Sequence, residues 1–348
     1  MTLTADEFPR MDPTPIFEHF RGSFATELLT AAVAHFNVFG RLAKSPATFE
    51  ELSADLQLQS RPSVVLFTAL KAFGLLEVID GKMHLTSLAA EHLVPGGTFD
   101  VGDYVGLAAG SPGVLEMVER LRTNKPAGAD DDEKGAAFIY REGMASAMEQ
   151  TDMARHFTLA LAGRAKNVAP YLAARISLKK TQTLLDVGGG TGFYSIACLQ
   201  KNPKLTAMVL DRPEVLKVAA ELANEYGVAD RLQLIPGDMF ESELPPADAI
   251  LLSNVLHDWD VPECKKLLSR CVNVLPAKGR VLIHDVFLND ALDGPLPIAL
   301  YSANLFCLTE GRAYSAAEYR AWLIDLGLTP FSVVPTLIHC GVLEGLKQ

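Results

Sequence analysis

The sequence lacks the features that mark several classes of protein. It has only five cysteines and no C-x-x-C pair, so nothing supports a structural zinc site, and we expect reduced thiols in a reducing compartment. Glycine and proline, at 26 and 20 residues, stay close to ordinary usage, which excludes a collagen-like or low-complexity chain. The composition is that of an ordinary globular protein.

Positive charge and long apolar runs are also scarce. Lys and Arg number 31 against 42 Asp and Glu, a formal net charge of −11 that repels nucleic-acid phosphates and anionic membrane surfaces. No apolar run is long enough to span a bilayer, and the first residues lack the basic region and apolar stretch of a signal peptide. We therefore expect a cytoplasmic protein that binds neither nucleic acid nor membrane.

The N-terminal part, residues 1–100, is predicted to be mainly helical. Apolar residues recur at helical spacing over 13–43, and a capping box at 48–51 opens a short helix. A second helix is expected over 60–74, and the Asp-Gly pair at 80–81 is the turn that most strongly signals a β-hairpin. The order helix, helix, hairpin is a winged-helix pattern.

Residues 101–180 form a helical connector, interrupted over 124–135. The interruption holds a run of four acids, Asp130, Asp131, Asp132 and Glu133. Clustered carboxylates can bind a divalent cation, but a run outside an ordered scaffold is typical of a solvated loop, so we expect no metal.

Residues 181–348 alternate between strand and helix patterns, which predicts an α/β domain with a doubly wound parallel sheet. The expected strands are 181–187, 207–210, 232–235, 249–253 and 280–285. After a capped helix from Ser315, the runs 329–335 and 336–343 stand too close together for a helical crossover and predict a terminal antiparallel hairpin.

A glycine-rich loop stands where the first of these strands meets a helix. Gly188, Gly190 and Gly192 follow the G-x-G-x-G spacing, and position 193, where a dinucleotide-binding loop needs a third glycine, is Phe193. This departure argues against a nicotinamide-dependent dehydrogenase. Asp186 precedes the loop, where a carboxylate repels a diphosphate but attracts a ligand that carries an ammonium group.

Two further acids follow the next two strands. Asp211 can accept hydrogen bonds from both ribose hydroxyls, and Asp238 can take an adenine amino group. Met239 and Phe240 are expected to pack on the adenine ring. Acids at the carboxyl ends of consecutive strands resemble the Rossmann-like class I methyltransferase fold, which implies S-adenosylmethionine as cofactor.

The fourth strand leads into His257-Asp258-Trp259. Together with the glycine loop and Gly237-Asp-Met-Phe240, this sequence resembles the small-molecule O-methyltransferases of plant phenolic, acetylserotonin and bacterial polyketide type. The resemblance spans nearly the whole chain and implies a winged-helix-like dimerisation domain, a homodimer, a small aromatic hydroxyl acceptor and His257 as general base. The chemistry agrees, because a phenol must lose its proton and histidine accepts one near neutral pH. Asp258, and Asp285 at the end of the fifth strand, are the acids expected to support it.

The chain departs from these relatives at two positions. Ala313 stands where many have a second acid beside the histidine, which leaves Asp285, or Glu310, to orient the base. Ser253 aligns with a lysine that lies near the cofactor in the plant enzymes, and its hydroxyl can still donate one hydrogen bond. The resemblance also implies the residues of the acceptor pocket: Phe157, Leu161, Asn304, Leu305 and Phe306.

Other functions stay open. Family members that methylate nitrogen or carbon, or that use the cofactor in decarboxylation or hydroxylation, would carry the same cofactor residues. A winged helix also suggests a DNA-binding regulator, but residues 1–100 hold seven Lys and Arg against twelve Asp and Glu, and the candidate recognition helix 60–74 offers only Arg61 and Lys71. The identity of the acceptor lies beyond the sequence.

Overall fold

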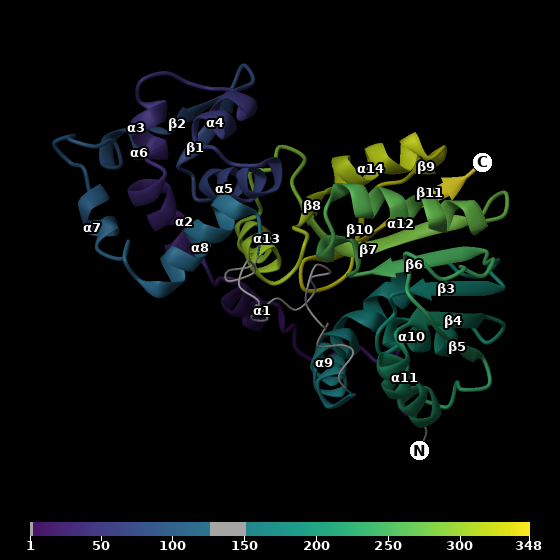
Figure 1. Ribbon diagram of the computed structural model, residues 1–348. Helices are drawn as coiled ribbons and strands as arrows, with labels where there is room; N and C mark the ends of the chain where they lie inside the picture. The colour runs from purple at the N-terminus through teal and green to yellow at the C-terminus, as the bar shows by residue number, and fades with distance from the viewer. Residues whose placement is uncertain (1–2, 126–150) are drawn as a thin grey trace. The chain divides into compact units, whose positions relative to one another are not determined.

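The computed structural model describes residues 3–125 and 151–348, which group into two compact units (Figure 1). The sheet unit comprises Met1–Phe17, Ala145–Phe287 and Ala316–Gln348, and the helical unit comprises Glu18–Met144 and Leu288–Ser315. The acidic run at 130–133 lies outside the described residues. The division into 1–100, 101–180 and 181–348 stays a prediction.

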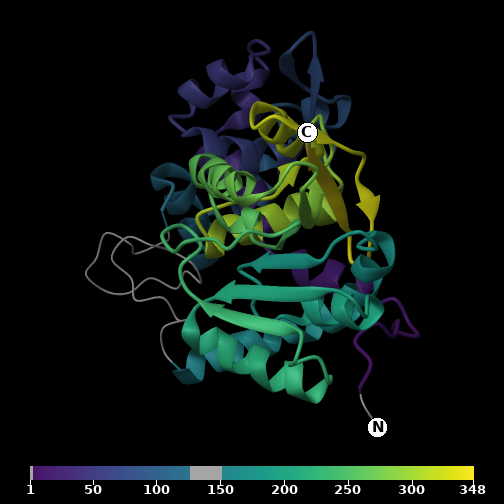
Figure 2. The ribbon, with the colours of Figure 1, turned by 90° about the vertical axis from the view of Figure 1, so that its right-hand side faces the viewer.

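The sheet unit is built on a mixed, largely parallel sheet. Its main path runs β10-β11-β7-β6-β3-β4-β5, and β9 pairs with β11. The strands are β3 (Thr183–Val187), β4 (Thr206–Asp211), β5 (Leu232–Pro236), β6 (Ala249–Ser253), β7 (Arg280–Leu288), β9 (Leu328–Pro330), β10 (Val334–Pro335) and β11 (Cys340–Lys347). Strands β5, β4, β3, β6 and β7 pair in parallel, which confirms the predicted α/β fold, and β3, β4 and β5 lie side by side in Figure 2.

The order of these strands fixes where a ligand can bind. The chain runs outward from β3 through β4 to β5 and then returns to β6 on the other side of β3. In open α/β sheets, such a reversal leaves a crevice at the carboxyl ends of the two central strands. The glycine loop follows β3, and His257 follows β6, so both stand at this edge of the sheet.

The terminal strands are antiparallel, as predicted, but their boundaries differ from the prediction. The run 329–335 divides into β9 and β10, and the last strand begins at Cys340 rather than at position 336. Ile338 and His339 have φ values of 55° and 59°, and left-handed backbone cannot continue an extended strand. β11 pairs antiparallel with β7, where Gly341 stands opposite Asp285.

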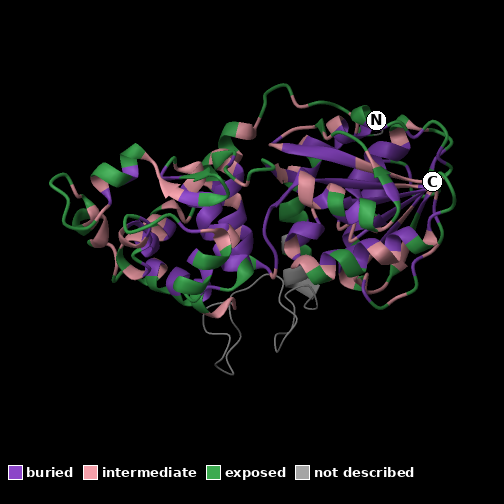
Figure 3. Ribbon diagram, turned by 90° about the horizontal axis from the view of Figure 1, so that it is seen from above, coloured by how far each residue is buried: buried purple, intermediate pink, exposed green. Residues whose placement is uncertain are grey.

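Helices pack against the sheet and against one another. The helices of the sheet unit are α9 (Thr151–Arg175), α10 (Phe193–Lys201), α11 (Pro213–Glu225), α12 (Val261–Val274) and α14 (Ala316–Asp325). α9 contacts α10 and α11, whereas α14 contacts β9 and β11. The central strands are almost fully buried (Figure 3), as their near-continuous apolar sequence requires when helices cover both faces of a sheet.

The helical unit contains the predicted helices and hairpin. Its elements are α2 (Ala25–Thr30), the π-helix η1 (Ala31–His35), α3 (Val38–Leu42), α4 (Phe49–Asp55), α5 (Ser60–Ala72), β1 (Leu76–Ile79), β2 (Lys82–Leu85), α6 (Ser87–His92), α7 (Gly102–Gly106), α8 (Pro112–Thr123) and α13 (Leu296–Leu308). α1 (Thr14–Arg21) lies across the division between the units. Both hydrogen bonds of the capping box at Thr48 and Glu51 are present. Asp80 and Gly81 form the hairpin turn with φ values of 51° and 76°. The winged-helix assignment itself stays a prediction.

Two absences hold for the described part of the chain. None of its helices combines the length and apolar character needed to cross a bilayer. Nor do the described side chains include a group of three or more His, Cys, Asp or Glu placed to hold a metal ion.

Candidate active site

The glycine loop between β3 and α10 adopts a conformation that favours glycine. Gly188, Gly190 and Gly192 have φ values of 66°, 57° and 66°. A Cβ atom added to Gly190 would meet nothing within 4 Å, whereas one on Gly188 would lie 3.1 Å from Val255. The loop therefore offers open space at Gly190, where backbone can approach a ligand closely.

Asp186 lies at the end of β3 and is fully buried. Its Oδ2 atom accepts a hydrogen bond of 2.8 Å from the Ser195 hydroxyl, and its Oδ1 atom has no hydrogen-bond partner among the residues that the structure describes. Burial raises the pKa of Asp186 to about 7. A buried oxygen with nothing to accept is costly, and a ligand cation would stabilise the carboxylate. This observation fits the ammonium-bearing cofactor predicted from the sequence.

Asp211, at the end of β4, ties its strand to the glycine loop. Its Oδ2 atom accepts a hydrogen bond of 2.7 Å from the Gly190 N–H, and its Oδ1 atom accepts one of the same length from Arg212. Burial raises the pKa of Asp211, and these two backbone donors act in the opposite direction. The contact fixes the loop against the second strand, where ribose hydroxyls are expected.

The segment after β5 holds the predicted adenine-binding residues. Asp238 accepts a hydrogen bond of 2.7 Å from the Phe240 N–H, and its side chain is 45% exposed, so it stays accessible to a ligand. Met239 is close to the glycine loop, because its sulfur lies 3.8 Å from a Cβ placed on Gly188. Phe240 is only 4% exposed, and its ring packs edge-on against Trp259 with centroids 4.8 Å apart. Phe240 thus belongs mainly to the core beside this segment.

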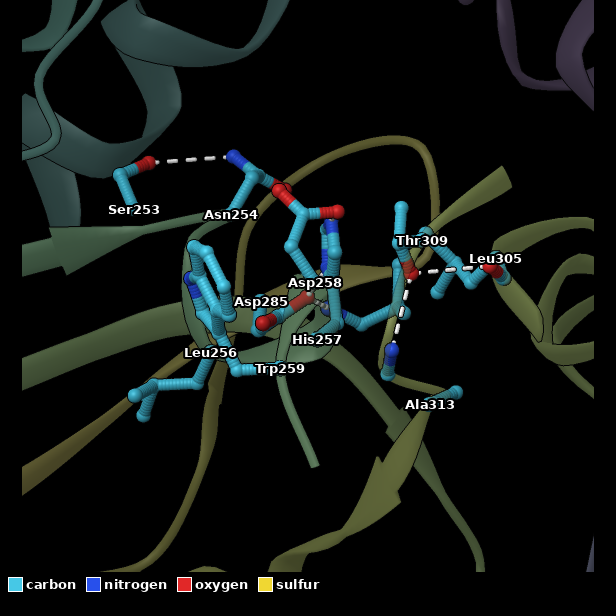
Figure 4. Close-up of polar contacts among 12 residues, drawn as sticks. Ser253, Asn254, Leu256, His257, Asp258, Trp259, Asp285, Leu305, Thr309 and Ala313 are labelled. Carbon is cyan, nitrogen blue, oxygen red and sulfur yellow. Dashed lines mark hydrogen bonds and ion pairs between the residues drawn. The ribbon is translucent and has the colours of Figure 1, made fainter. Parts of the chain in front are cut away.

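His257 lies on the short helix η3 (Leu256–Asp258), directly after β6. Its Nδ1 atom is 2.5 Å from Oδ1 of Asp285, and its Nε2 atom is 3.7 Å from Oδ1 of Asp258 (Figure 4). The exposed fraction is 4% for His257 and 1% for Asp285, so the pair is shielded from water. The structure therefore brings together the three residues that the sequence predicted as catalytic.

The charges of the two acids dominate the ionisation of His257. Burial lowers the pKa of the imidazole, but Asp285 and then Asp258 outweigh burial, so the pKa stands above its usual 6.5. Burial likewise acts to raise the pKa of Asp285, but the charge of His257 and its hydrogen bond hold that pKa below the usual range. Burial raises the pKa of Asp258 to about 6. Asp285 is therefore ionised throughout the range in which His257 titrates, whereas Asp258 is mostly ionised only above about pH 6.

The contact with Asp285 also selects the tautomer of His257. When the imidazole is neutral, a proton on Nδ1 is donated to the carboxylate, which leaves Nε2 as the basic nitrogen. Asp285 is itself held in place, because its Oδ1 atom accepts a hydrogen bond of 2.8 Å from the Val286 N–H. The arrangement can take a proton at Nε2 and stabilise the resulting imidazolium.

Tyr319 is a residue of this site that sequence reasoning missed. Its hydroxyl on α14 donates a hydrogen bond of 3.4 Å to Oδ2 of Asp285, and its side chain is fully buried. At Ala313, the expected second-acid position, the side chain is fully buried in the helical unit and the N–H donates to the Ser302 hydroxyl. No spacing in the sequence links Tyr319 to Asp285, so only the fold reveals this contact.

The residues predicted for the acceptor pocket differ in exposure. Leu161 on α9 is 50% exposed, and the side chain of Phe157 on the same helix lies outside the described part of the structure. Asn304, Leu305 and Phe306 are on α13 in the helical unit, where Asn304 is half-buried and Leu305 is buried. Phe306 is fully buried in the core of this unit, and the guanidinium groups of Arg61 and Arg120 lie over its ring at 5.1 and 4.9 Å.

Ser253 is part of a polar network that the sequence did not predict. It is 8% exposed, and its Oγ atom lies 2.8 Å from Nδ1 of His284. His284 contacts Tyr194 of α10, whereas its neighbour Asp285 contacts Tyr319 of α14, so the two side chains leave opposite faces of β7, as expected for a regular strand. Ser253 thus contacts His284, and its expected hydrogen bond to the cofactor stays a prediction.

The chain is similar to several known proteins. Residues 130–329 match the O-methyltransferase domain family. The chain is 35% identical to 3-hydroxy-5-methyl-1-naphthoate 3-O-methyltransferase of Streptomyces sahachiroi, over 92% of this chain and 91% of the relative. It is 30% identical to L-tyrosine C(3)-methyltransferase of Streptomyces lavendulae, over 89% of this chain and 85% of the relative. It is also similar to the crystal structure of an O-methyltransferase family 2 protein from Planctomyces limnophilus in complex with apigenin, with a TM-score of 0.90, 48% identity, and coverage of 100% of this chain and 99% of that one.

Proposed function

Because the chain belongs to the O-methyltransferase family, we propose that it transfers a methyl group to a hydroxyl of a small aromatic molecule, with His257 as general base. Family membership makes the protein a methyltransferase that uses S-adenosylmethionine. The observation that carries the proposal is the buried contact of 2.5 Å between Nδ1 of His257 and Asp285 at the crevice edge of the sheet.

The cofactor supplies an electrophilic methyl group on a sulfonium. Asp186 would hold its ammonium group, since Oδ1 is buried and accepts nothing from the described residues. Asp211 is proposed for the ribose hydroxyls, and the half-exposed Asp238 for the adenine amino group. The open backbone at Gly190 would let the ligand approach the loop closely.

His257 would take the hydroxyl proton of the acceptor. Asp285 accepts the Nδ1 proton and so keeps Nε2 basic, while its negative charge stabilises the imidazolium that forms. The raised pKa of His257, set by Asp285 and Asp258 against the effect of burial, makes it a stronger base than a free imidazole. Methyl transfer is an in-line displacement, so positioning the deprotonated oxygen is the other contribution of the protein.

The acceptor is proposed to be a hydroxylated aromatic compound of bicyclic or flavonoid size. This inference rests on the relative that methylates a hydroxynaphthoate and on the similar structure solved with apigenin. Leu161, with half of its side chain exposed, and Asn304 are the accessible candidates for contacts with the acceptor. Phe306 is a weaker candidate because it is fully buried in the core of the helical unit.

The direct test is mass spectrometry of products formed from S-adenosylmethionine and a panel of acceptors that includes apigenin and hydroxynaphthoates. The wild-type enzyme is expected to add one methyl mass to a panel member, and His257→Ala to reduce that rate about 100-fold or more. The matched control is His92→Ala, which removes a histidine from α6 in the helical unit. Methyl transfer that survives His257→Ala unchanged would refute the role of His257 as base.

Methylation at carbon is a second candidate, since the chain is 30% identical to an L-tyrosine C(3)-methyltransferase. A phenol that has lost its proton is activated at oxygen and at the adjacent ring carbon, so the same base serves both reactions. NMR of the product distinguishes them by the chemical shift of the added methyl group. A product without an added methyl mass would instead point to cofactor-assisted decarboxylation or hydroxylation.

We also propose that the protein forms a homodimer through its N-terminal helices. Ile16 and Phe20, four residues apart on one face of α1, are each 71% exposed. Large apolar side chains exposed together on one face are typical of a protein interface. Size-exclusion chromatography with light scattering is expected to give twice the mass of 37.6 kDa, and a monomer at micromolar concentration would refute this proposal.

The cysteines support a location in a reducing compartment, which we propose to be the cytoplasm. All five lie in the described part of the structure and none forms a disulfide there, and four of them are buried: Cys198, Cys264, Cys271 and Cys340. Fractionation of cells that express a tagged protein tests this, and recovery with extracytoplasmic markers would contradict it.

A further inference from the structure

Asn254 directs the chain from β6 towards His257. It is the first residue after the strand, and its φ of 57° lies in the left-handed region, which asparagine tolerates better than most residues. Its N–H donates a hydrogen bond of 2.8 Å to the carbonyl of His284 on β7. Because His257 follows only three residues later, the conformation at Asn254 sets the position of the imidazole.

The side chain of Asn254 is held by three elements. The Nη2 group of Arg164, on α9, donates a hydrogen bond of 2.6 Å to Oδ1 of Asn254. The Nδ2 group of Asn254 then donates to the Ser253 hydroxyl at 3.1 Å (Figure 4) and to the Tyr194 hydroxyl at 3.3 Å. Since a guanidinium can only donate, Arg164 fixes which end of the amide faces α9.

The network continues beyond Asn254. Burial lowers the pKa of His284 to about 3, so this imidazole is neutral and has one donor and one acceptor nitrogen. The Ser253 hydroxyl accepts from Asn254, and its Oγ atom lies 2.8 Å from Nδ1 of His284. Nε2 of His284 lies 3.1 Å from the Thr336 hydroxyl. The turn after β6 is thus linked through Ser253 to β7 and to the segment before β11.

We propose that Arg164 and Asn254 act together as positioning residues, which hold the turn after β6 so that His257 meets Asp285 and the acceptor in the reactive geometry. The inference rests on the proposed function. It assigns a part in methyl transfer to α9, although Arg164 stands 93 positions before the base in the sequence. Neither residue touches the reacting atoms: both position the backbone that carries His257, and Arg164 in addition acts on the imidazole through its charge.

Arg164 also places a positive charge near the base. The groups that act on His257 are Asp285 on β7, Asp258 on η3 and Arg164 on α9, and Tyr319 on α14 contacts Asp285. The pKa of His257 is lowered first by burial, raised by the two acids and lowered by Arg164. Loss of the positive charge should therefore raise the pKa of His257, which a purely structural role would not do.

The test compares Arg164→Met, Arg164→Lys, Asn254→Gly and the double variant Arg164→Met/Asn254→Gly. We expect kcat to fall about 10- to 100-fold in each single variant, because a small misplacement of a catalytic group has effects of this size. If the residues act as a pair, the double variant should be no slower than the slower single variant. Arg164→Lys keeps the charge but loses the guanidinium geometry, so its kcat should fall while the acidic limb of its pH–rate profile stays where it is in wild type.

The matched control is Arg155→Met, which removes another arginine of α9. The side chain of Arg155 forms an exposed ion pair of 2.8 Å with Glu221, and its loss should leave kcat and the pH profile unchanged. Binding of S-adenosylhomocysteine, measured by calorimetry, is expected to stay within about threefold of wild type in all variants, since the proposed pair acts on the base.

A second measurement needs no acceptor. NMR of protein labelled with ¹⁵N-histidine follows the titration of His257 from about pH 5 to about pH 9, and the signal is assigned by its absence from His257→Ala. We expect the titration midpoint of His257 to rise in Arg164→Met and to stay unchanged in Arg155→Met. If wild type methylates no acceptor, the proposed function fails, but the titration still tests the pair. If Arg164→Met does not fold, the kcat values of Arg164→Lys and Asn254→Gly test the proposal instead. The proposal would be overturned if a folded Arg164→Met variant kept the kcat of wild type and the titration midpoint of His257 did not move. It would also be overturned if Arg164→Lys kept the kcat of wild type.

Discussion

Replacing Asp285 with Asn removes the charge that supports His257 and keeps the shape of the side chain. The exposed fractions of His257 and Asp285 are 4% and 1%, and their atoms Nδ1 and Oδ1 are 2.5 Å apart, so water cannot substitute for the lost carboxylate. Without Asp285, burial dominates and the pKa of His257 falls. The amide can also donate to Nδ1, which would move the imidazole proton to Nε2 and block the base. We expect kcat/KM to fall about 100-fold, at the lower end of what general-base catalysis contributes.

The same substitution should also change how the rate depends on pH. The pKa of wild-type His257 lies above 6.5, so its rate should fall as the pH drops through that pKa, and the acidic limb should move to lower pH in Asp285→Asn. Asp285 and His257 also make the free energy of unfolding depend on pH. The pKa of Asp285 in the folded protein is below 3.8, so this carboxylate stabilises the fold above pH 3.8. The pKa of His257 in the folded protein is above 6.5, so this imidazolium stabilises the fold below pH 6.5, and the stabilisation is lost as the pH rises through the folded pKa. The variant should therefore lose about 2 kcal/mol of unfolding free energy between these pH values and less above them.

The assay is steady-state methyl transfer between about pH 5 and pH 9, with urea unfolding at the same pH values. Asp290→Asn, an exposed acid two residues after the end of β7, serves as the control. A variant at position 285 that kept both the plateau rate and the acidic limb of wild type would refute the view that Asp285 orients and charges the base.

Three further changes have defined outcomes. Asp186→Asn should weaken S-adenosylhomocysteine binding at least about tenfold in calorimetry. Without ligand, the variant should melt at a higher temperature than wild type at pH 8 but not at pH 4. The reason is that the pKa of Asp186 is raised from 3.8 to about 7, so the wild-type protein loses stability as the pH rises from 3.8 to about 7, and this loss is complete at pH 8. Gly189→Ala places a Cβ 2.7 Å from Cγ of Asp186, so it should lower the free energy of unfolding in urea by about 1–3 kcal/mol and impair ligand binding. Gly190→Ala has open space around its Cβ and should lower the same free energy by only about 1 kcal/mol, the cost of its left-handed backbone. Thr48→Ala removes the capping box of α4 and should cost about 1 kcal/mol in thermal or urea unfolding with no change in kcat; a loss of activity would contradict its purely structural role.

The sequence alone was sufficient to predict the architecture of the sheet unit. Strand and helix periodicity along residues 181–348 identified the parallel strands, because burial on both faces of a sheet requires continuous apolar runs. The capping box at Thr48 and the turn at Asp80 were likewise confirmed, since their geometry depends on neighbouring residues. The exact start of the last strand was missed, because the left-handed backbone at Ile338 and His339 has no local signal such as glycine.

In the candidate active site, too, some features could be predicted from the sequence and others depend on the tertiary structure. Position near a strand end is encoded locally, so His257, Asp186 and Asp211 could be named from the sequence as residues of one edge of the sheet. The predicted end of the fifth strand at Asp285 was wrong, because β7 continues through apolar residues to Leu288. Which atoms meet is decided by tertiary structure: Tyr319 reaches Asp285 from α14, and Arg164 reaches Asn254 across 90 positions. Such contacts depend on how helices pack against the sheet, and helix packing is set by the shape of many side chains together rather than by any spacing in the chain.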